Sequence, residues 1–158
     1  MSKFHEYKST VVWTGNKGPG TITARDYERS HNVSIEGKPL ILASSDTPFR
    51  GDGSKHNPED FFVSALSSCH MLWYLHLCAD AGVVVIAYED HAFGKMEEKD
   101  SGGGNFVEVI LQPQIKVKSK AMIEKAMQLH HAANQKCFIA NSCNFPVKHQ
   151  ASYTYEEE

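Results

Sequence analysis

The stretch His56–Gly82 reads HNPEDFFVSALSSCHMLWYLHLCADAG and carries the signals of one long helix. Asn57 suits the N-cap, and Pro58 suits the first helical position because its missing N–H would have no partner there. Gly82 can adopt the left-handed conformation that ends many helices. Between these limits apolar residues occur on every side, which is typical of a helix buried all round. We therefore predict a long, buried central helix.

A membrane-spanning helix is the alternative, because at about 1.5 Å per residue this segment is long enough to cross a bilayer. Six polar residues within it argue against a membrane span: Ser64, Ser67, Ser68, His70, His76 and Asp80. We interpret His76 as a hydrogen-bonded core histidine and Cys78 as a small packed side chain. The segment is thus predicted to be a core helix, with no membrane partner.

The chain has 158 residues and a formal net charge of −3, without a basic run. This size predicts one compact domain over 1–158. A chain with this charge has no basic segment to which nucleic acid would bind, so no such partner is expected. Residues Met1–Glu6 contain no apolar segment of an export signal, so we expect a cytoplasmic protein with reduced thiols. Four cysteines in that compartment indicate thiol chemistry or metal binding rather than structural disulfides.

The segments outside the central helix alternate strand, turn and helix signals. In chain order they predict an antiparallel meander over 7–43, a loop over 44–56, a hairpin over 83–96 and 105–118, a second helix over 119–136 and a final strand over 145–155. Strands followed by helices in this order predict an α+β fold.

Each of the two predicted helices has a cysteine within it or directly after it. Cys69 lies in the middle of the central helix, and Cys137 directly follows the second helix. They are 68 positions apart (137 − 69), so only the tertiary fold could bring them together.

The residues around both cysteines resemble the OsmC/Ohr family of osmotically induced and organic hydroperoxide resistance proteins. Asn57-Pro58-Glu59 followed by Ser67-Ser68-Cys69 resembles the helix that carries the family's peroxidatic cysteine. Ala132–Asn141 resembles the segment that carries its resolving cysteine. The order of elements agrees over essentially the whole chain. The resemblance implies an OsmC-like fold, with antiparallel sheets around the central helix, and an intertwined homodimer.

The resemblance also implies a thiol-dependent peroxidase that reduces organic hydroperoxides, an antioxidant activity of the oxidative stress response. A Cys69 thiolate would attack the distal peroxide oxygen, release an alcohol and become a sulfenic acid. The Cys137 thiol would then condense with the sulfenic acid to a disulfide. An external dithiol, of the lipoyl type by family analogy, would reduce that disulfide, and no bound cofactor is expected.

A buried thiol needs a nearby cation to be a thiolate at neutral pH. The family supplies an arginine held by a glutamate, and Glu59 matches that glutamate. In the organic hydroperoxide branch the arginine comes from the first Gly-rich turn, where this chain has Lys17. Arg29 is the preferred replacement because it also comes from the N-terminal meander. Arg50 is the alternative activating residue, and it could equally organise its own loop by pairing with a nearby aspartate.

Other functions are open at this stage. An OsmC-fold protein without peroxidase activity that binds a small apolar ligand is the main alternative, since the cation is displaced from its usual place. A zinc site would join Cys69 or Cys137 to histidines, but the ligand spacing typical of zinc is missing, so no metal is expected. A Cys–His acyl transferase is disfavoured because His70 points about 100° away from Cys69 on the helix. Cys143 is either a competing thiol or a small turn residue.

The distance between Glu59 and Cys69 favours a shared site. The ten positions between them (69 − 59) span about 15 Å of a straight helix. Glu59 therefore cannot readily reach the sulfur of its own chain. If Glu59 orients the activating arginine as the resemblance implies, either a loop bridges the gap or a second copy of the chain brings its own Glu59 beside Cys69. We accordingly expect an obligate homodimer.

Overall fold

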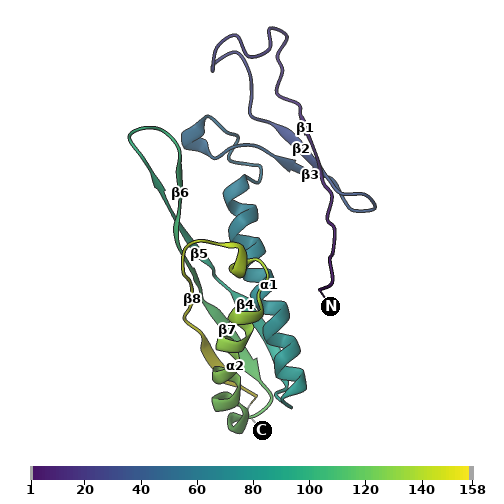
Figure 1. The fold of residues 1–158 in the computed structure, drawn as a ribbon, viewed down its shortest axis with the longest axis vertical. Helices are drawn as coiled ribbons and strands as arrows, with labels where there is room; N and C mark the ends of the chain where they lie inside the picture. Colours follow the sequence, from purple (N-terminus) through teal and green to yellow (C-terminus); the bar gives the residue numbers. More distant parts are fainter. Residues whose placement is uncertain (1, 157–158) are drawn as a thin grey trace. The chain divides into compact units, whose positions relative to one another are not determined.

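The computed structural model of the protein describes residues 2–156. Contacts between residues divide the chain into two compact units, one that ends at Phe61 and one that begins at Phe62. The N-terminal unit contains one three-stranded sheet, and the C-terminal unit contains two further three-stranded sheets (Figure 1). The prediction of a single domain over 1–158 stays a prediction.

The N-terminal sheet is the predicted antiparallel meander. Its strands are β1 (Thr10–Trp13), β2 (His31–Ser34) and β3 (Ile41–Ala43), in the order β1-β2-β3. Residues 21–23 lie within the predicted meander but do not form a strand, because the backbone turns there: the Thr23 N–H donates to Asp26 Oδ2 and the Asp26 N–H donates to Thr23 O. Local side-chain bonding thus overrides the β-propensity of this segment.

The loop over 44–56 has a defined local structure. It contains the short helix η1 (Thr47–Phe49), whose first backbone N–H donates to Asp46 Oδ1 at 2.7 Å. Arg50 ends this helix in the left-handed conformation, with a φ of 65°. A Cβ atom at Gly51 would lie 1.5 Å from the Ser45 carbonyl oxygen, so only glycine fits there. The loop is therefore held by its own short-range contacts.

Helix α1 (Pro58–Asp80) begins and ends where the sequence predicts. The Asp60 N–H donates to Asn57 Oδ1, and the Asn57 N–H donates to Asp60 Oδ2, which is a reciprocal capping arrangement. At the other end Gly82 has a φ of 73°, and the Val83 N–H donates to the Cys78 carbonyl. These bonds satisfy backbone groups that the helix ends would leave free.

One stripe of α1 is fully buried within the chain. It consists of residues at a spacing of four: Leu66, His70, Tyr74 and Cys78. Other apolar residues of the helix are less covered, and Leu72 is 64% exposed. By length and composition α1 could also cross a membrane, a test that the core helices of soluble proteins pass as well. Its buried stripe makes it the core helix of the C-terminal unit, and Cys78 is the predicted packed side chain.

The predicted hairpin after α1 forms, but it is divided between two sheets. In one part β4 (Val85–Asp90) pairs with β7 (Pro113–Val117), and in the other β5 (Phe93–Glu98) pairs with β6 (Gly104–Leu111), all antiparallel. At the division Asp90 Oδ1 accepts a hydrogen bond from the Gln112 N–H at 2.6 Å. The hairpin therefore changes sheets where a side chain replaces a backbone partner.

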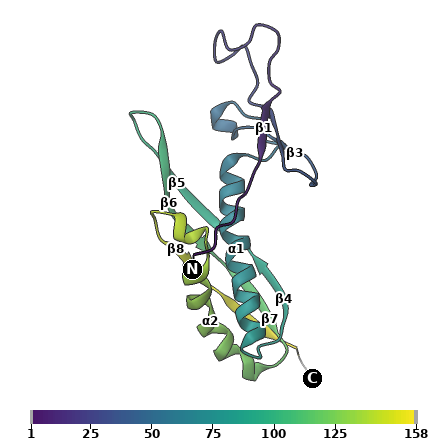
Figure 2. The same ribbon diagram turned by 45° about the vertical axis from the view of Figure 1, so that its right-hand side comes forward.

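The predicted final strand is divided in the same way. β8 (Val147–His149) runs parallel to β6, and β9 (Ser152–Tyr155) runs parallel to β7. The second helix α2 (Ile123–Lys136) follows the short helix η2 (Lys120–Met122) and precedes η3 (Ala140–Ser142). Figure 2 shows α2 beside the C-terminal half of α1.

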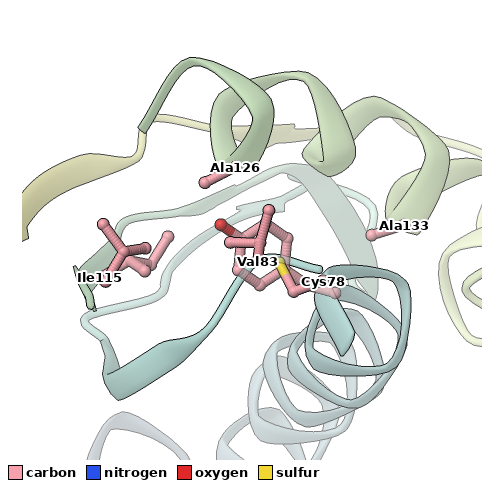
Figure 3. Close-up of a cluster of buried hydrophobic side chains, with 7 residues drawn as sticks. Cys78, Val83, Ile115, Ala126 and Ala133 are labelled. Atoms are coloured by element: carbon pink, nitrogen blue, oxygen red, sulfur yellow. The ribbon is translucent and has the colours of Figure 1, made fainter. Parts of the chain in front are cut away.

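The main core lies between the two helices and the sheet of β7. Its buried members are Tyr74, Cys78, Val83, Ile115, Val117, Ala126 and Ala133 (Figure 3). The side chains that α2 contributes are alanines, and small side chains let a helix approach its neighbours closely. A second buried cluster of Leu66, Val109 and Leu111 lies nearer the start of α1. Both helices that carry the candidate cysteines are thus fixed by packing.

Candidate active site

The fold brings Cys69 and Cys137 together. Cys69 comes from the middle of α1, and Cys137 is the C-cap residue of α2, where the backbone turns from helical to extended. The Cys69 thiol is near enough to Cys137 to raise its pKa, and both cysteines are free thiols. Two thiols from separate helices are therefore neighbours in the fold.

The two thiols differ in exposure. Cys137 is only 1% exposed, whereas Cys69 is half-buried. Burial, and the neighbouring Cys69 thiol, raise the pKa of Cys137 to about 11, although the Ala140 N–H donates to its sulfur at 3.4 Å. Cys137 is therefore protonated at neutral pH, and Cys69 is the thiol that a molecule from solution can reach.

The position of Cys137 follows from the pattern of α2. The buried residues of this helix are Ala126, His130 and Ala133, and Cys137 continues their spacing by one more turn. The Cys137 N–H donates to the Asn134 carbonyl, and the Cys137 carbonyl accepts from the Asn141 N–H at 3.0 Å. The buried stripe and these bonds hold the thiol against α1.

An aromatic pair and a cation border the two cysteines. Trp73, one turn after Cys69, meets Phe138 edge to face with ring centroids 5.9 Å apart. The Lys136 ammonium lies 5.4 Å from the centroid of the Trp73 ring, a cation–π contact. Sequence reasoning missed Lys136, although its place directly before Cys137 was a signal that could have drawn attention to it.

The histidines of α1 have roles other than the expected ones. The interpretation of His76 as a core histidine is wrong: its side chain is 62% exposed and lies 3.5 Å from Asp80 Oδ2. His70 is the buried histidine, because it belongs to the stripe that faces the core, and its Nε2 bonds to His130 Nδ1 at 2.9 Å. Within residues 2–156 no group of three or more histidine, cysteine or acidic side chains has an arrangement that could hold a metal ion.

The expected activating residues lie in the N-terminal unit. Arg29 donates from Nη1 to the Ala24 and Tyr27 carbonyls at 2.7 and 2.9 Å, and its guanidinium lies 4.3 Å from the centroid of the Tyr27 ring. Glu59 is half-buried in the first turn of α1, and Arg50 is exposed. Among the ion pairs of the described residues none joins Glu59 to either arginine.

Two neighbouring charges of that unit have other partners. Lys17, in the turn where the resemblance places the family's arginine, lies 3.9 Å from Glu28. Asp52, an expected partner of Arg50, instead pairs with Lys55 at 3.1 Å. Its bonds to Ser54 and Lys55 lower the pKa of Asp52 to about 2. The loop is thus organised by Lys55 and by backbone bonds.

Cys143 is a half-buried thiol that donates to the Ile139 carbonyl at 3.3 Å. It packs with the second buried cluster, and burial raises its pKa. This contact with Ile139 fits the interpretation as a turn residue.

A hollow of about 370 Å³ borders the segment that precedes Cys69. Ser64, Ser67 and Ser68 line one side, and Tyr88, Asp90, His91 and Ala92 line the other. Ser67 Oγ donates to Asp90 Oδ2 at 2.5 Å. A small molecule has room here, but Cys69 is not part of the lining, and the lining residues of α1 centre on the helix face opposite to Cys69.

Comparisons with known proteins agree with this fold. The family model described as OsmC-like protein matches residues 51–152. An OsmC-like protein of unknown function from Vibrio cholerae is 32% identical, with a TM-score of 0.82 over 94% of this chain and 100% of that chain. No curated protein matches the chain.

Two more distant solved structures are similar in fold alone. An organic hydroperoxide resistance protein from Elizabethkingia anophelis, with crystallant-derived thiocyanate bound, is 19% identical, with a TM-score of 0.70 over 99% of this chain and 100% of that chain. An organic hydroperoxide resistance protein from Legionella pneumophila is 14% identical, with a TM-score of 0.70 over 97% of this chain and 99% of that chain. The predicted α+β, OsmC-like fold is confirmed, and the chain belongs to the family of OsmC-like proteins.

Proposed function

We propose that this protein is a thiol-dependent peroxidase that reduces organic hydroperoxides through a Cys69–Cys137 cycle. The observation that carries the proposal is the proximity of two thiols of unequal exposure, which come from two separate helices. Such a pair suits a two-step reaction, because the accessible thiol can meet the peroxide and the buried one can resolve the product. The hydroperoxide resistance proteins with this fold are consistent with it.

In the first step the Cys69 thiolate attacks the distal oxygen of the hydroperoxide. The O–O bond breaks, the alcohol leaves with a proton, and Cys69 becomes a sulfenic acid. In the second step the Cys137 sulfur attacks the Cys69 sulfur, and the thiol proton leaves with the hydroxyl group as water. The raised pKa of Cys137 keeps its proton in place until that step. An external dithiol then reduces the disulfide and is itself oxidised.

The activating cation and the assembly are part of the proposal. Arg29, held by Glu59, is our first candidate for the cation, and Arg50 is the second. Both hydrogen bonds of Arg29 come from Nη1, so its other nitrogens can face a carboxylate and a sulfur. We propose a homodimer in which Glu59 of one chain serves the thiol of the other. The exposed apolar residues Val12, Leu72 and Phe138 are surface that a second copy would cover.

A peroxide-consumption assay tests the proposal directly. The protein is given cumene hydroperoxide with either dihydrolipoamide or glutathione as reductant. We expect turnover with the dithiol, none in Cys69→Ser, and a trapped sulfenic acid on Cys69 in Cys137→Ser. Cys143→Ser is the matched control and should retain turnover. Full activity in Cys69→Ser would overturn the assignment.

The second candidate is a protein of the same fold that binds a small apolar ligand without peroxidase activity. The hollow beside Ser68 favours it, because Val63, Met71 and Ala92 add apolar surface to its lining. Binding of a fluorescent fatty-acid probe, combined with no consumption of peroxide, would select this function. Met71→Asp should then weaken the binding, whereas Cys69→Ser should not.

A further inference from the structure

Three histidines from three elements meet where the two helices that carry the thiols pack on each other. We call His70 on α1, His130 on α2 and His149 on β8 the imidazole cluster. The rings of His70 and His130 are coplanar within 3° and joined end to end by the 2.9 Å bond between Nε2 and Nδ1. The His149 ring stacks at 5.1 Å from His130 and 5.8 Å from His70, between ring centroids.

The cluster joins the same two helices that carry the thiols. His70 directly follows Cys69 on α1, and on α2 His130 stands two turns before Cys137 in the same buried stripe. Beside this bond the two helices make packing contacts: the Tyr74 ring lies on His130, and Lys136 lies over the Trp73 ring. A hydrogen bond is more directional than such packing, so it adds a fixed register between α2 and α1.

In the neutral pair one ring donates and the other accepts, and protonation of both rings would remove the lone pair that accepts the bond. A neutral imidazole has one N–H and one lone pair, so each ring uses one nitrogen in this bond and its other nitrogen takes no part in it. These other nitrogens are His70 Nδ1 and His130 Nε2, which are buried and have no hydrogen-bond partner among the described residues. An added proton would therefore create a buried imidazolium whose new N–H finds no acceptor.

The surroundings offer no compensation for such a charge. The titratable groups that pack on the two rings are Tyr74 from α1, His149 from β8 and Tyr153 from β9. His131 in turn contributes to the lowered pKa of His149. Every charge that protonation of these histidines would place here is therefore positive. Burial, with the neighbouring imidazoles, lowers the pKa of His70 to about 4 and that of His130 to about 3.

We propose that the imidazole cluster is a positioning device that holds Cys137 against Cys69 while its rings are neutral, and that acid releases this contact. The proposal rests on the proposed function in one respect: the peroxidase cycle is the reaction that would use the closeness of the two cysteines. When the helices separate, His70 and His130 reach water and regain an ordinary affinity for protons. Protons therefore favour the separated state as the pH falls below about 6.5.

Thiol–disulfide exchange with glutathione tests the proposal without any peroxide. Oxidised glutathione is reduced to two thiols as the Cys69–Cys137 bond forms, and the equilibrium constant reports how well the two cysteines are held together. In the wild-type protein we expect this constant to fall at least about tenfold between pH 7 and pH 5. In His70→Phe/His130→Phe, which keeps rings of similar size, the fall should disappear. His91→Phe, whose side chain is exposed and lies outside the cluster, is the matched control and should behave as the wild type.

A measurement on the unaltered protein covers the case in which the double variant does not fold. Coupling is reciprocal, so the disulfide must lower the proton affinity of His70 and His130 further than the reduced state does. Nitrogen-15 NMR titrations of the two rings should thus differ between the oxidised and reduced protein. Identical titrations in both redox states, or a wild-type exchange constant independent of pH from 7 to 5, would overturn the proposal. Neither result would touch the peroxidase proposal, because neither experiment uses a peroxide.

Discussion

The sheet of the N-terminal unit and the sheets of the C-terminal unit use similar apolar residues in different ways. Every residue of β1 is exposed, although the strand reads Thr-Val-Val-Trp. In β7, by contrast, Pro113, Ile115 and Val117 are buried against the helices. The C-terminal unit therefore has a core of its own, whereas the N-terminal sheet presents apolar surface. This contrast is one reason for our proposal that the first unit serves assembly of a homodimer, whereas the second holds the two thiols.

The largest expected effect is on the folding of the C-terminal unit. Leu66 is fully buried with Val109 and Leu111, so Leu66→Ala should lower the free energy of unfolding by about 2–5 kcal/mol. Met127→Ala, on the exposed side of α2, should change it by less than about 0.5 kcal/mol. Urea denaturation followed by circular dichroism measures both. Equal losses would mean that the core is not where the structure has it.

The next effect comes from the buried histidines of the same unit. The native pKa values of His70 and His130, about 4 and 3, lie below the ordinary value, so the unfolded chain binds more protons. The free energy of unfolding should be constant above about pH 7.5 and should fall by about 2 kcal/mol for each histidine between pH 7.5 and pH 5. Urea denaturation over this range is the measurement, with His70→Phe/His130→Phe as the control. A wild-type dependence no steeper than the control's would contradict the account.

The third effect concerns assembly of the homodimer rather than folding of the chain. Val12 on β1 is 51% exposed, and Val12→Asp should weaken the homodimer at least about tenfold, or about 1.4 kcal/mol, while the chain stays folded. Val84→Asp, at a similarly exposed position of the C-terminal unit, is the matched control. Analytical ultracentrifugation at low micromolar concentration measures the change. A wild-type monomer with full peroxidase activity would refute the dimer.

Local signals in the sequence predicted the elements well. The ends of α1 are set by Asn57, Pro58 and Gly82, each of which acts on residues close to it in the sequence. Such signals can be recognised without knowledge of the fold. The side that a helix buries was harder to predict. With apolar residues all around α1, nothing local distinguished His70, in the buried stripe, from the exposed His76. That choice is made by α2 and the sheet.

Features that depend on distant segments were not predictable. The division of the hairpin at Gln112 and the parallel pairing of β8 and β9 depend on partners far along the chain. The same holds for the site: the spacing of Cys69 and Cys137 indicated only that a fold could join them. Lys136 over the Trp73 ring and the bond between His70 and His130 arise from the packing of α2 on α1.

The most direct test of the central claim is mass spectrometry of the reduced protein after one equivalent of an organic hydroperoxide. The account predicts loss of two hydrogen atoms per chain and, after proteolysis without reductant, a peptide pair joined by a Cys69–Cys137 disulfide. The same treatment of Cys69→Ser should leave Cys137 as a thiol. A dominant Cys137–Cys143 or Cys69–Cys143 bond, or a wild-type chain whose cysteines all remain thiols, would contradict it.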